Sequence, residues 1–344
     1  MKHASIHLRS ACGRAARPAS AGLATFLSLV ALGCGGDNNN NKADAAKGLD
    51  AKPIDGAGGQ DGSGSGSSAP VNVSMNLTGG ANGLWWDAAT NTLFLTDSEA
   101  DTLVKYTDAG GLAVVATLPP DANGISLGNV LEDGDGNVLT PDFGFGSSGT
   151  IFEVAAGAGS GTALTGLDPL RRRIGLAVDP NGQLYSSYFE GGKNSAIGGV
   201  AKLTIGGGSA TEVELAGSNN AAGFKKIVGV AATADHVYVS DQSGSAVFAV
   251  DPTTGDVTTL ASGLATADLL FMMPNGDLLT GGSAAITRIT QAGVVSTVDF
   301  GSAGSGFSDI RGIAYDPANK RIFFVDHSSV AGTPDVLHIL PLAQ

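Results

Sequence analysis

From Val71 onward, apolar and polar residues alternate in short runs, the pattern of β-strands whose two faces differ in burial. Pairs of such runs recur along the chain. The first run of a pair carries glycine and often ends in aspartate, and the second ends in Thr, Ser or Asp. One copy reads Gly-Leu-Ala-Val-Asp-Pro-Asn-Gly at 175–182, followed by Leu-Tyr-Ser at 184–186. The first runs of the six copies begin at Gly83, Gly128, Gly175, Gly229, Asp268 and Gly312.

The spacing of these copies predicts a β-propeller. The mean step from Gly83 to Gly312 is about 46 residues, the length of one four-stranded blade. Two more alternating runs follow a pair, as at 102–106 and 112–116, which gives four strands per copy. Asn-Gly at 181–182 lies between paired runs, where tight hairpins need positive φ. We therefore expect an all-β, six-bladed propeller over residues 71–344.

The two ends of this domain predict how the ring closes. The sixth copy has only three strands, the last at Val336–Leu340, and the run Val71–Leu77 has no partner in the first copy. An N-terminal strand that joins the last blade pairs two sheet edges that are otherwise open. We expect this closure, because five or seven blades leave a strand unplaced.

The first 33 residues have the layout of an export signal. Four cations precede an uncharged run from Ala19 to Gly33, and this run of about fifteen residues is too short to span a bilayer as a permanent helix. The residues before Cys34 resemble a bacterial lipobox, whose cysteine is lipidated. We expect a lipoprotein signal peptide at 1–33 and lipidation of Cys34. An ordinary signal with a chance cysteine is the alternative.

Residues 34–70 are rich in Asn, Gly and Ser and carry almost no large apolar side chains. Such a segment cannot bury enough surface to offset the entropy of ordering it. We expect a disordered tether that holds the propeller at the bacterial cell envelope, with the lipid on Cys34 as the only membrane contact. Gly35 after the cysteine is compatible with the outer membrane.

Charge and cysteine content exclude several classes of function. The chain has 19 basic and 32 acidic residues and a net charge of −13, which argues against binding nucleic acid through charge. Its two cysteines, Cys12 and Cys34, both precede the predicted domain, so disulfides and thiol chemistry are excluded there. We expect a monomer whose partner is an envelope protein or a small ligand.

The segment Gly-Leu-Ala-Val-Asp-Pro-Asn-Gly-Gln-Leu-Tyr at 175–185 and its counterparts at 83 and 312 resemble the six-bladed propellers of the regucalcin/gluconolactonase and NHL-repeat families. The resemblance covers Val71 to Gln344. It implies a lactonase that holds a divalent cation with a glutamate, two asparagines and an aspartate at the start of inner strands. Asp268 matches the aspartate, Asn82 stands at the glutamate position, and Ile174 and Val228 stand where asparagines are expected.

This incomplete set leads to two hypotheses. The first is a non-enzymatic scaffold without a cofactor, which binds a ligand or a protein. The alternative is a metal-dependent hydrolase of lactones or esters, with calcium or zinc on Asn82 and Asp268, and Asp268 as the catalytic residue. Arg311 either contacts a ligand or neutralises Asp268. The basic cluster formed by Arg171, Arg172 and Arg173 either meets an anionic ligand or is a solvated loop.

Other motifs have simpler interpretations. Asp133–Asn137 offers oxygens at alternate positions, as calcium loops do, but Val138 begins a strand, which favours a hairpin turn. Gly144–Gly149 matches G-x-G-x-x-G, yet a strand follows where a nucleotide site needs a helix. The insertion at 191–199 is a candidate binding loop. Aspartates that end the second strand of a blade are expected to hydrogen-bond within it: Asp97, Asp241 and Asp326.

Overall fold

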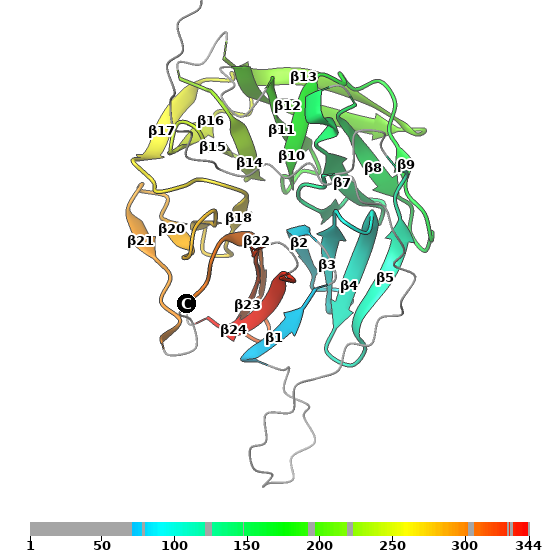
Figure 1. Ribbon diagram of the computed structural model, residues 1–344. Coiled ribbons are helices and arrows are strands. Elements are labelled where there is room, and N and C mark those ends of the chain that lie inside the picture. The colour runs from blue at the N-terminus through cyan, green and yellow to red at the C-terminus, as the bar shows by residue number, and fades with distance from the viewer. Residues whose placement is uncertain are drawn as a thin grey trace, which may run out of the picture. The chain divides into compact units, whose positions relative to one another are not determined.

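The structure is a computed structural model, in which six four-stranded antiparallel sheets surround a common axis (Figure 1). This confirms the predicted all-β, six-bladed propeller. No helix among the described residues is long and apolar enough to cross a membrane. The predicted signal peptide, Cys34 and the tether lie outside the described residues. The structure describes residues 71–342 except 78–79, 121–125, 147, 192–196, 219–222, 302–305, 329 and 331–332.

In blades one to five the strands follow one another from the innermost outward, so every connection inside these blades is a hairpin. In blade six the outermost strand comes instead from the N-terminal end of the domain. Blade one comprises β2 (Ala81–Asp87), β3 (Thr92–Asp97), β4 (Thr102–Thr107) and β5 (Gly111–Thr117), and blade two comprises β6 (Leu131–Glu132), β7 (Val138–Asp142), β8 (Thr150–Val154) and β9 (Thr162–Ala163), with a 3₁₀ turn η1 (Gly144–Gly146). Blade three comprises β10 (Arg171–Val178), β11 (Leu184–Glu190), β12 (Ile197–Gly206) and β13 (Ser209–Gly217).

All four strands of blade five are short, at three residues each, and its sequence repeat begins with Asp268 in place of the glycine of the other copies. Blade four comprises β14 (Ile227–Ala232), β15 (Val237–Asp241), β16 (Ala246–Val250) and β17 (Val257–Ser262), and blade five comprises β18 (Leu270–Met272), β19 (Leu278–Thr280), β20 (Thr287–Ile289) and β21 (Val295–Thr297). Blade six comprises β22 (Ile310–Asp316), β23 (Arg321–Asp326), β24 (Val336–Pro341) and β1 (Val73–Asn76).

The N-terminal strand closes the ring as predicted. β1 pairs antiparallel with β24, from Val73 opposite Ile339 to Asn76 opposite Val336. The edges of β1 and β24 that face each other are therefore hydrogen-bonded. Figure 1 shows β1 beside β24 and next to blade one.

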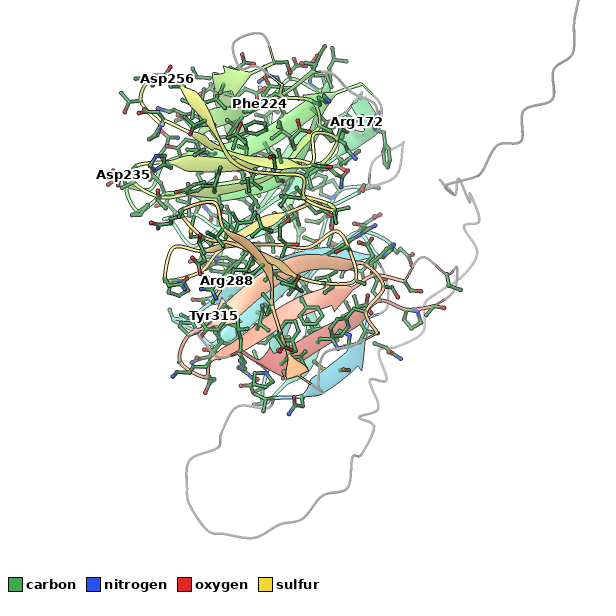
Figure 2. The ribbon with its side chains drawn as sticks, turned by 90° about the vertical axis from the view of Figure 1, so that its left-hand side faces the viewer. Arg172, Phe224, Asp235, Asp256, Arg288 and Tyr315 are labelled. Atoms are coloured by element: carbon green, nitrogen blue, oxygen red, sulfur yellow. The ribbon has the colours of Figure 1, made fainter. Side chains whose placement is uncertain are left out.

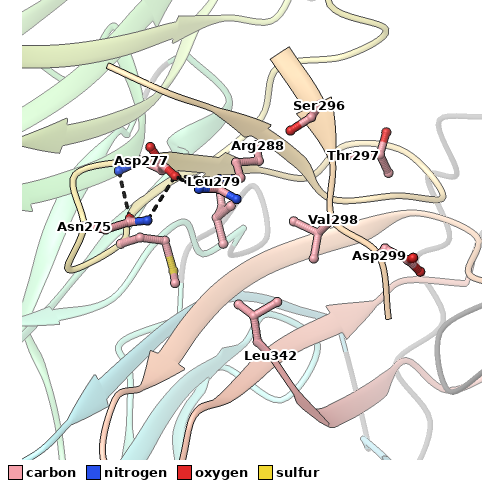
Figure 3. A pocket seen from close by; sticks show the side chains of 10 residues that line it. Asn275, Asp277, Leu279, Arg288, Ser296, Thr297, Val298, Asp299 and Leu342 are labelled. Atoms are coloured by element: carbon pink, nitrogen blue, oxygen red, sulfur yellow. Dashed lines mark hydrogen bonds and ion pairs between the residues drawn. The ribbon is translucent and has the colours of Figure 1, made fainter. Parts of the chain in front are cut away.

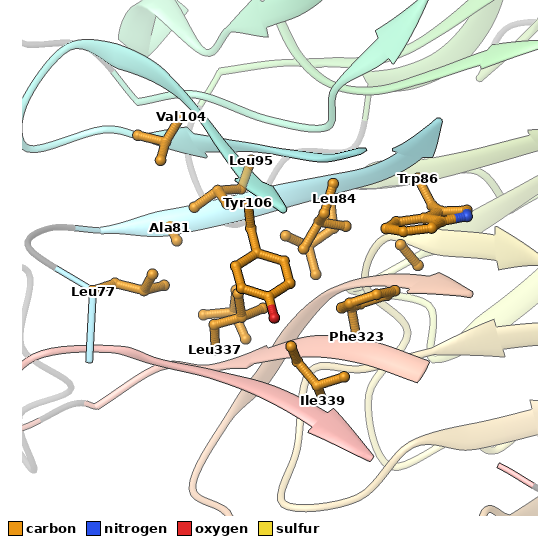
Figure 4. Close-up of a cluster of buried hydrophobic side chains, with 13 residues drawn as sticks. Leu77, Ala81, Leu84, Trp86, Leu95, Val104, Tyr106, Phe323, Leu337 and Ile339 are labelled. Carbon is orange, nitrogen blue, oxygen red and sulfur yellow. The ribbon is translucent and has the colours of Figure 1, made fainter. Parts of the chain in front are cut away.

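The hydrophobic core lies mainly between neighbouring blades. At the seam between blades six and one, Leu84, Trp86 and Tyr106 pack against Phe323 and Ile339 (Figure 4). The Trp86 and Phe323 rings stack with centroids 5.0 Å apart. Burying aromatic surface of this size is a major stabilising contribution, which here holds the first blade against the last.

A buried arginine also crosses this seam. The Arg321 side chain is fully buried, and its Nη1 and Nη2 each lie 2.8 Å from a different carboxylate oxygen of Asp108, in the β4–β5 turn. Its Nε donates to Asp316 at 2.8 Å. The guanidinium also lies 5.3 Å from the Trp86 ring centroid. Arg321 therefore links blade six to blade one with every donor group directed at an acceptor or an aromatic face.

The two glycine-rich motifs adopt the structures that their sequences indicate. One Asp133 carboxylate oxygen accepts hydrogen bonds from the backbone N–H groups of Asp135 and Asn137, both at 2.9 Å, which caps the β6–β7 hairpin. The G-x-G-x-x-G segment forms η1 and then enters β8. The hairpin expected at 133–137 is confirmed, and no helix follows Gly149.

We predict that Arg321→Met lowers the free energy of unfolding by about 3 kcal/mol, because it leaves Asp316 buried without its cation. Urea denaturation of the purified full chain measures this, with exposed Lys105→Met in β4 as the control. Equal stability of the two variants would show that the seam does not depend on this ion pair.

Candidate functional site

Side-chain hydroxyls fix the spacing between the inner strands of neighbouring blades. The Ser240 hydroxyl accepts a hydrogen bond from the Gly229 N–H at 2.8 Å and donates to the Asp268 carbonyl of the next blade at 2.6 Å. Thr96 and Ser187 form the same bridges in blades one and three. The recurring Thr or Ser of the sequence repeat thus connects each of these blades to its neighbour.

Glycine lets the backbones approach at these bridges. A Cβ on Gly128 would lie 2.1 Å from the Ile174 carbonyl oxygen, and one on Gly229 would lie 2.5 Å from the Asp268 carbonyl oxygen. Both distances are far inside van der Waals contact, so no other residue fits without moving a blade. The register between β10 and β11 shifts beside Gly175, and the register between β14 and β15 shifts beside Gly229. Each shift is a local β-bulge.

Four consecutive blades each bring charged groups to the start of their inner strands. We call these residues the axial cluster: Arg172 in β10, Lys226 before β14, Asp268 before β18, and Asp309 and Arg311 around the start of β22. The charges of Asp268, Arg172 and Arg311 act on the pKa of Lys226. Those of Arg311, Asp309 and Lys226 act on the pKa of Asp268, so the five residues share one electrostatic environment. Ile174, Phe189, Val228 and Leu269 form a buried apolar cluster at the same strand starts.

Asp268 is the acid of the axial cluster that forms no ion pair within the described part of the chain, whereas Asp309 pairs with Arg311. The Asp268 backbone N–H donates to the Thr280 hydroxyl at 2.9 Å, and its carboxylate forms no ion pair with any described residue. Burial raises the pKa of Asp268, Arg311 and Lys226 oppose this rise, and Asp309 adds to it. The residue as a whole is intermediate in solvent exposure. Asp268 is thus a desolvated carboxylate, without an ion pair among the described residues, in a residue that is not fully buried.

Lys226 and Arg172 lie against aromatic rings. The Lys226 ammonium donates to Gln242 Oε1 and lies 5.2 Å from the Phe189 ring centroid. Burial lowers the pKa of Lys226; Asp268 opposes this, and the two neighbouring arginines add to it. The Arg172 guanidinium lies 5.5 Å from the Phe143 ring, and burial lowers its pKa. In Figure 2, Arg172 lies on the face of the propeller opposite to Asp235 and Asp256.

The arginine triplet divides between two environments. Arg173 is fully buried and pairs with Glu212 at 2.7 Å, so it does not reach a ligand. Arg171 pairs with Glu212 and Glu214 and lies 3.8 Å from the centroid of the Tyr188 ring. Arg172 alone of the three belongs to the axial cluster. Alternation along a strand explains this, because neighbouring residues point to opposite faces.

Arg311 pairs with Asp309, whose carboxylate lies 3.2 Å from its Nε. It forms no ion pair with Asp268, although its charge opposes the rise in the pKa of Asp268. The strand-terminal aspartates act as expected. Asp241 accepts the backbone N–H of Lys226 at 3.1 Å, and Asp326 accepts that of Asp309 at 3.0 Å. These bonds hold the residues that precede the inner strands.

The residues at the predicted metal site do not fit a divalent cation. Asn82 Nδ2 donates to the Leu127 carbonyl at 2.8 Å, and Ile174 and Val228 offer no side-chain oxygen. Lys226 and Arg311 already place positive charge beside Asp268, which disfavours binding of a divalent metal cation there. In the described part of the chain, no three His, Cys, Asp or Glu side chains are grouped to hold a metal.

A separate pocket lies on the flank of blade five (Figure 3). Asn275, Asp277, Arg288 and Leu342 are among its lining residues, and Arg288 forms an ion pair with Asp277. Asp277 lies in the β18–β19 turn, at the opposite end of the blade from Asp268. Because its arginine is already paired with a carboxylate, this pocket is a weaker candidate than the axial cluster. The predicted binding loop falls largely on residues 192–196, outside the described residues.

Comparison with solved structures finds the same fold. A gluconolactonase from Xanthomonas campestris matches with a TM-score of 0.57 and 16% identity, over 78% of this chain and 89% of that chain. A calcium-binding regucalcin from Agrobacterium tumefaciens matches with 0.56 and 14%, over 77% and 93%. A virginiamycin B lyase from Staphylococcus aureus matches with 0.51 and 15%, over 78% and 99%. The structural neighbours include six-bladed propellers of the gluconolactonase and regucalcin type. No protein-family model and no curated protein matches the sequence.

Lys226 and Asp309 are the residues of the axial cluster that were not predicted from the sequence. The expected ligand positions were those immediately before each inner strand, such as Asn82 and Asp268. Lys226 and Arg172 each stand three residues before an inner-strand glycine, and Asp309 stands three before Gly312. Comparing this second position across the repeats provides the missing signal.

We predict that Ser240→Ala lowers the free energy of unfolding by about 1–3 kcal/mol, because the Gly229 N–H and the Asp268 carbonyl lose their shared partner. Thermal and urea unfolding of the full chain measure this. Ser243→Ala, at an exposed turn of the same blade, is the control. A Ser240→Ala variant as stable as the control contradicts a structural role for the bridge.

Proposed function

We propose that this chain is a hydrolase of lactones or related esters that acts at the axial cluster without a metal ion. The observation that carries the proposal is Asp268, a desolvated carboxylate without an ion pair among the described residues, which lies within the electrostatic influence of Lys226 and Arg311. The resemblance to gluconolactonases gives the catalytic aspartate to this position. The gluconolactonase fold of the neighbours supports the proposal by analogy.

The arrangement supplies the groups that ester hydrolysis requires. The Asp268 carboxylate takes a proton from water while the water oxygen bonds to the carbonyl carbon and the C=O π electrons move onto oxygen. Lys226 and Arg311 offset that negative charge. The carbonyl then re-forms, the ring C–O bond breaks, and protonated Asp268 returns its proton to the leaving alkoxide. One lactone and one water give one hydroxy acid, and Asp268 is regenerated.

A binding scaffold without turnover is the second candidate. The observation that favours it is the apolar pair Ile174 and Val228, which stand at positions where the resemblance expects metal ligands. A scaffold uses the axial cluster to hold a ligand but leaves it unchanged. The first experiment below separates the two candidates.

We also propose that the mature chain is a lipoprotein of the bacterial cell envelope, anchored through Cys34 and held in the outer membrane. The lipobox-like residues before Cys34 and the Asn-, Gly- and Ser-rich segment after it support this location. Under this proposal, the propeller meets substrates outside the cytoplasm.

For the reaction, we predict hydrolysis of five- or six-membered lactones that persists in excess EDTA and falls by about a hundredfold or more in Asp268→Asn. A pH-indicator assay of acid release from a lactone panel measures it. Asp256→Asn, exposed on the opposite face in Figure 2, is the matched control. Activity that EDTA abolishes overturns the metal-free step. Absence of turnover across the panel favours the scaffold.

For the anchor, we predict that Cys34→Ser moves the chain from the membrane fraction to the soluble fraction and abolishes labelling with a radioactive fatty acid. Cys12→Ser is the matched control, because it removes the other cysteine of the chain. Fractionation of expressing cells measures both variants. Membrane retention of Cys34→Ser means that something other than the lipid holds the chain.

A further inference from the structure

Arg172 differs from every other arginine that the structure describes. Arg171, Arg173, Arg288, Arg311 and Arg321 each form an ion pair with a carboxylate. Arg172 forms none, and its Nη2 instead donates to the Phe145 carbonyl at 2.7 Å. Acidic residues outnumber basic ones in this chain, so an arginine without a carboxylate partner is unexpected here.

Lys226 shares this property on the neighbouring blade. Its ammonium donates to the neutral amide of Gln242, and it forms no ion pair within the described residues. Aromatic rings desolvate both cations, because Phe189 lies 6.0 Å from the Arg172 guanidinium and 5.2 Å from the Lys226 ammonium. Desolvating a cation without pairing it costs stability. Groups placed at such a cost are common where a ligand supplies the missing charge.

The backbone beside Arg172 is also held in an unfavourable conformation. Phe145 has φ +46°, in the left-handed region that non-glycine residues rarely adopt. Its carbonyl accepts the Arg172 bond, while its ring is 46% exposed and lies 5.6 Å from the Phe143 ring centroid. Strain of this kind persists where the surroundings enforce it, often at binding sites. The turn therefore presents an aromatic surface next to the unpaired guanidinium.

We infer that the axial cluster recognises an organic carboxylate, whose oxygens Arg172 and Lys226 bind while Phe143 and Phe145 cover its apolar part. Resting on the proposed function, this gives the substrate class as a lactone or ester that carries a carboxylate besides the bond to be hydrolysed. A guanidinium and an ammonium on adjacent blades provide one donor group for each carboxylate oxygen. A neutral lactone offers Arg172 no anionic partner, whereas a carboxylate bound there leaves Lys226 able to act on the carbonyl oxygen as well.

Binding of tetrahydrofuran-2-carboxylate to the full chain, measured by calorimetry, tests the inference, because this ring acid contains no ester to hydrolyse. The neutral tetrahydrofuran-2-carboxamide is the matched ligand. We expect the carboxylate to bind at least tenfold more tightly. Arg172→Gln and Lys226→Gln should each weaken carboxylate binding about tenfold or more, while Lys225→Gln, the exposed neighbouring lysine, should not. Inorganic phosphate is titrated in parallel.

Stability provides a second readout. Arg172→Gln should leave the melting temperature unchanged or raise it, because the variant removes a desolvated cation without a carboxylate partner. A lower melting temperature together with unchanged carboxylate affinity would assign Arg172 a structural role and overturn the inference.

Other outcomes are equally decisive. Equal affinity for the acid and the amide, an equal loss in Lys225→Gln, or binding of phosphate but not of the carboxylate each overturns the inference. Carboxylate binding without any lactone turnover leaves the inference standing and removes the hydrolase proposal. Turnover of neutral lactones that Arg172→Gln does not change removes the inference alone.

Discussion

The hydrogen bond that a Ser or Thr hydroxyl donates to the next blade's inner strand is the interaction on which the central arrangement depends. Ser240 receives the N–H of its own blade's glycine and passes a hydrogen bond to the carbonyl of Asp268. The same side chain therefore satisfies two buried backbone groups and sets the distance between two sheets. Because that carbonyl belongs to Asp268, the hydrogen bond that packs blade four against blade five also fixes the backbone position of the acid.

Charge is distributed in two ways across the propeller. Arginines within and between blades are paired with carboxylates, as Arg321 is with Asp108 and Asp316 and Arg173 is with Glu212. At the axis, Arg172 and Lys226 form no ion pair with any residue that the structure describes. Paired charges fix the fold, whereas unpaired desolvated charges leave interaction energy available to a ligand. This contrast is the observation that supports Arg172 and Lys226 as proposed ligand-binding residues.

The sequence predicted the six blades, the closing strand and the hairpin at 133–137 because these depend on local alternation, turn residues and a repeat length. It placed Asp268 at an inner-strand start for the same reason. Arg173 and Arg311 were beyond such reasoning, because their partners, Glu212 and Asp309, are chosen by side-chain direction. The bulges beside the glycines change that direction locally, and no pattern of hydrophobicity records them. Lys226 was accessible from the repeats but required comparison of a second position.

The pairing of β1 with β24 imposes an order on folding. Val73 is among the first residues of the domain to be synthesised, and its partner Ile339 is among the last. Until β24 has been synthesised, β1 has no partner strand in the domain. An unpaired strand edge is prone to pairing with other chains. Contacts this distant in sequence also form slowly. The ring is thus a late product of folding, and the axial cluster, built from blades three to six, assembles with it.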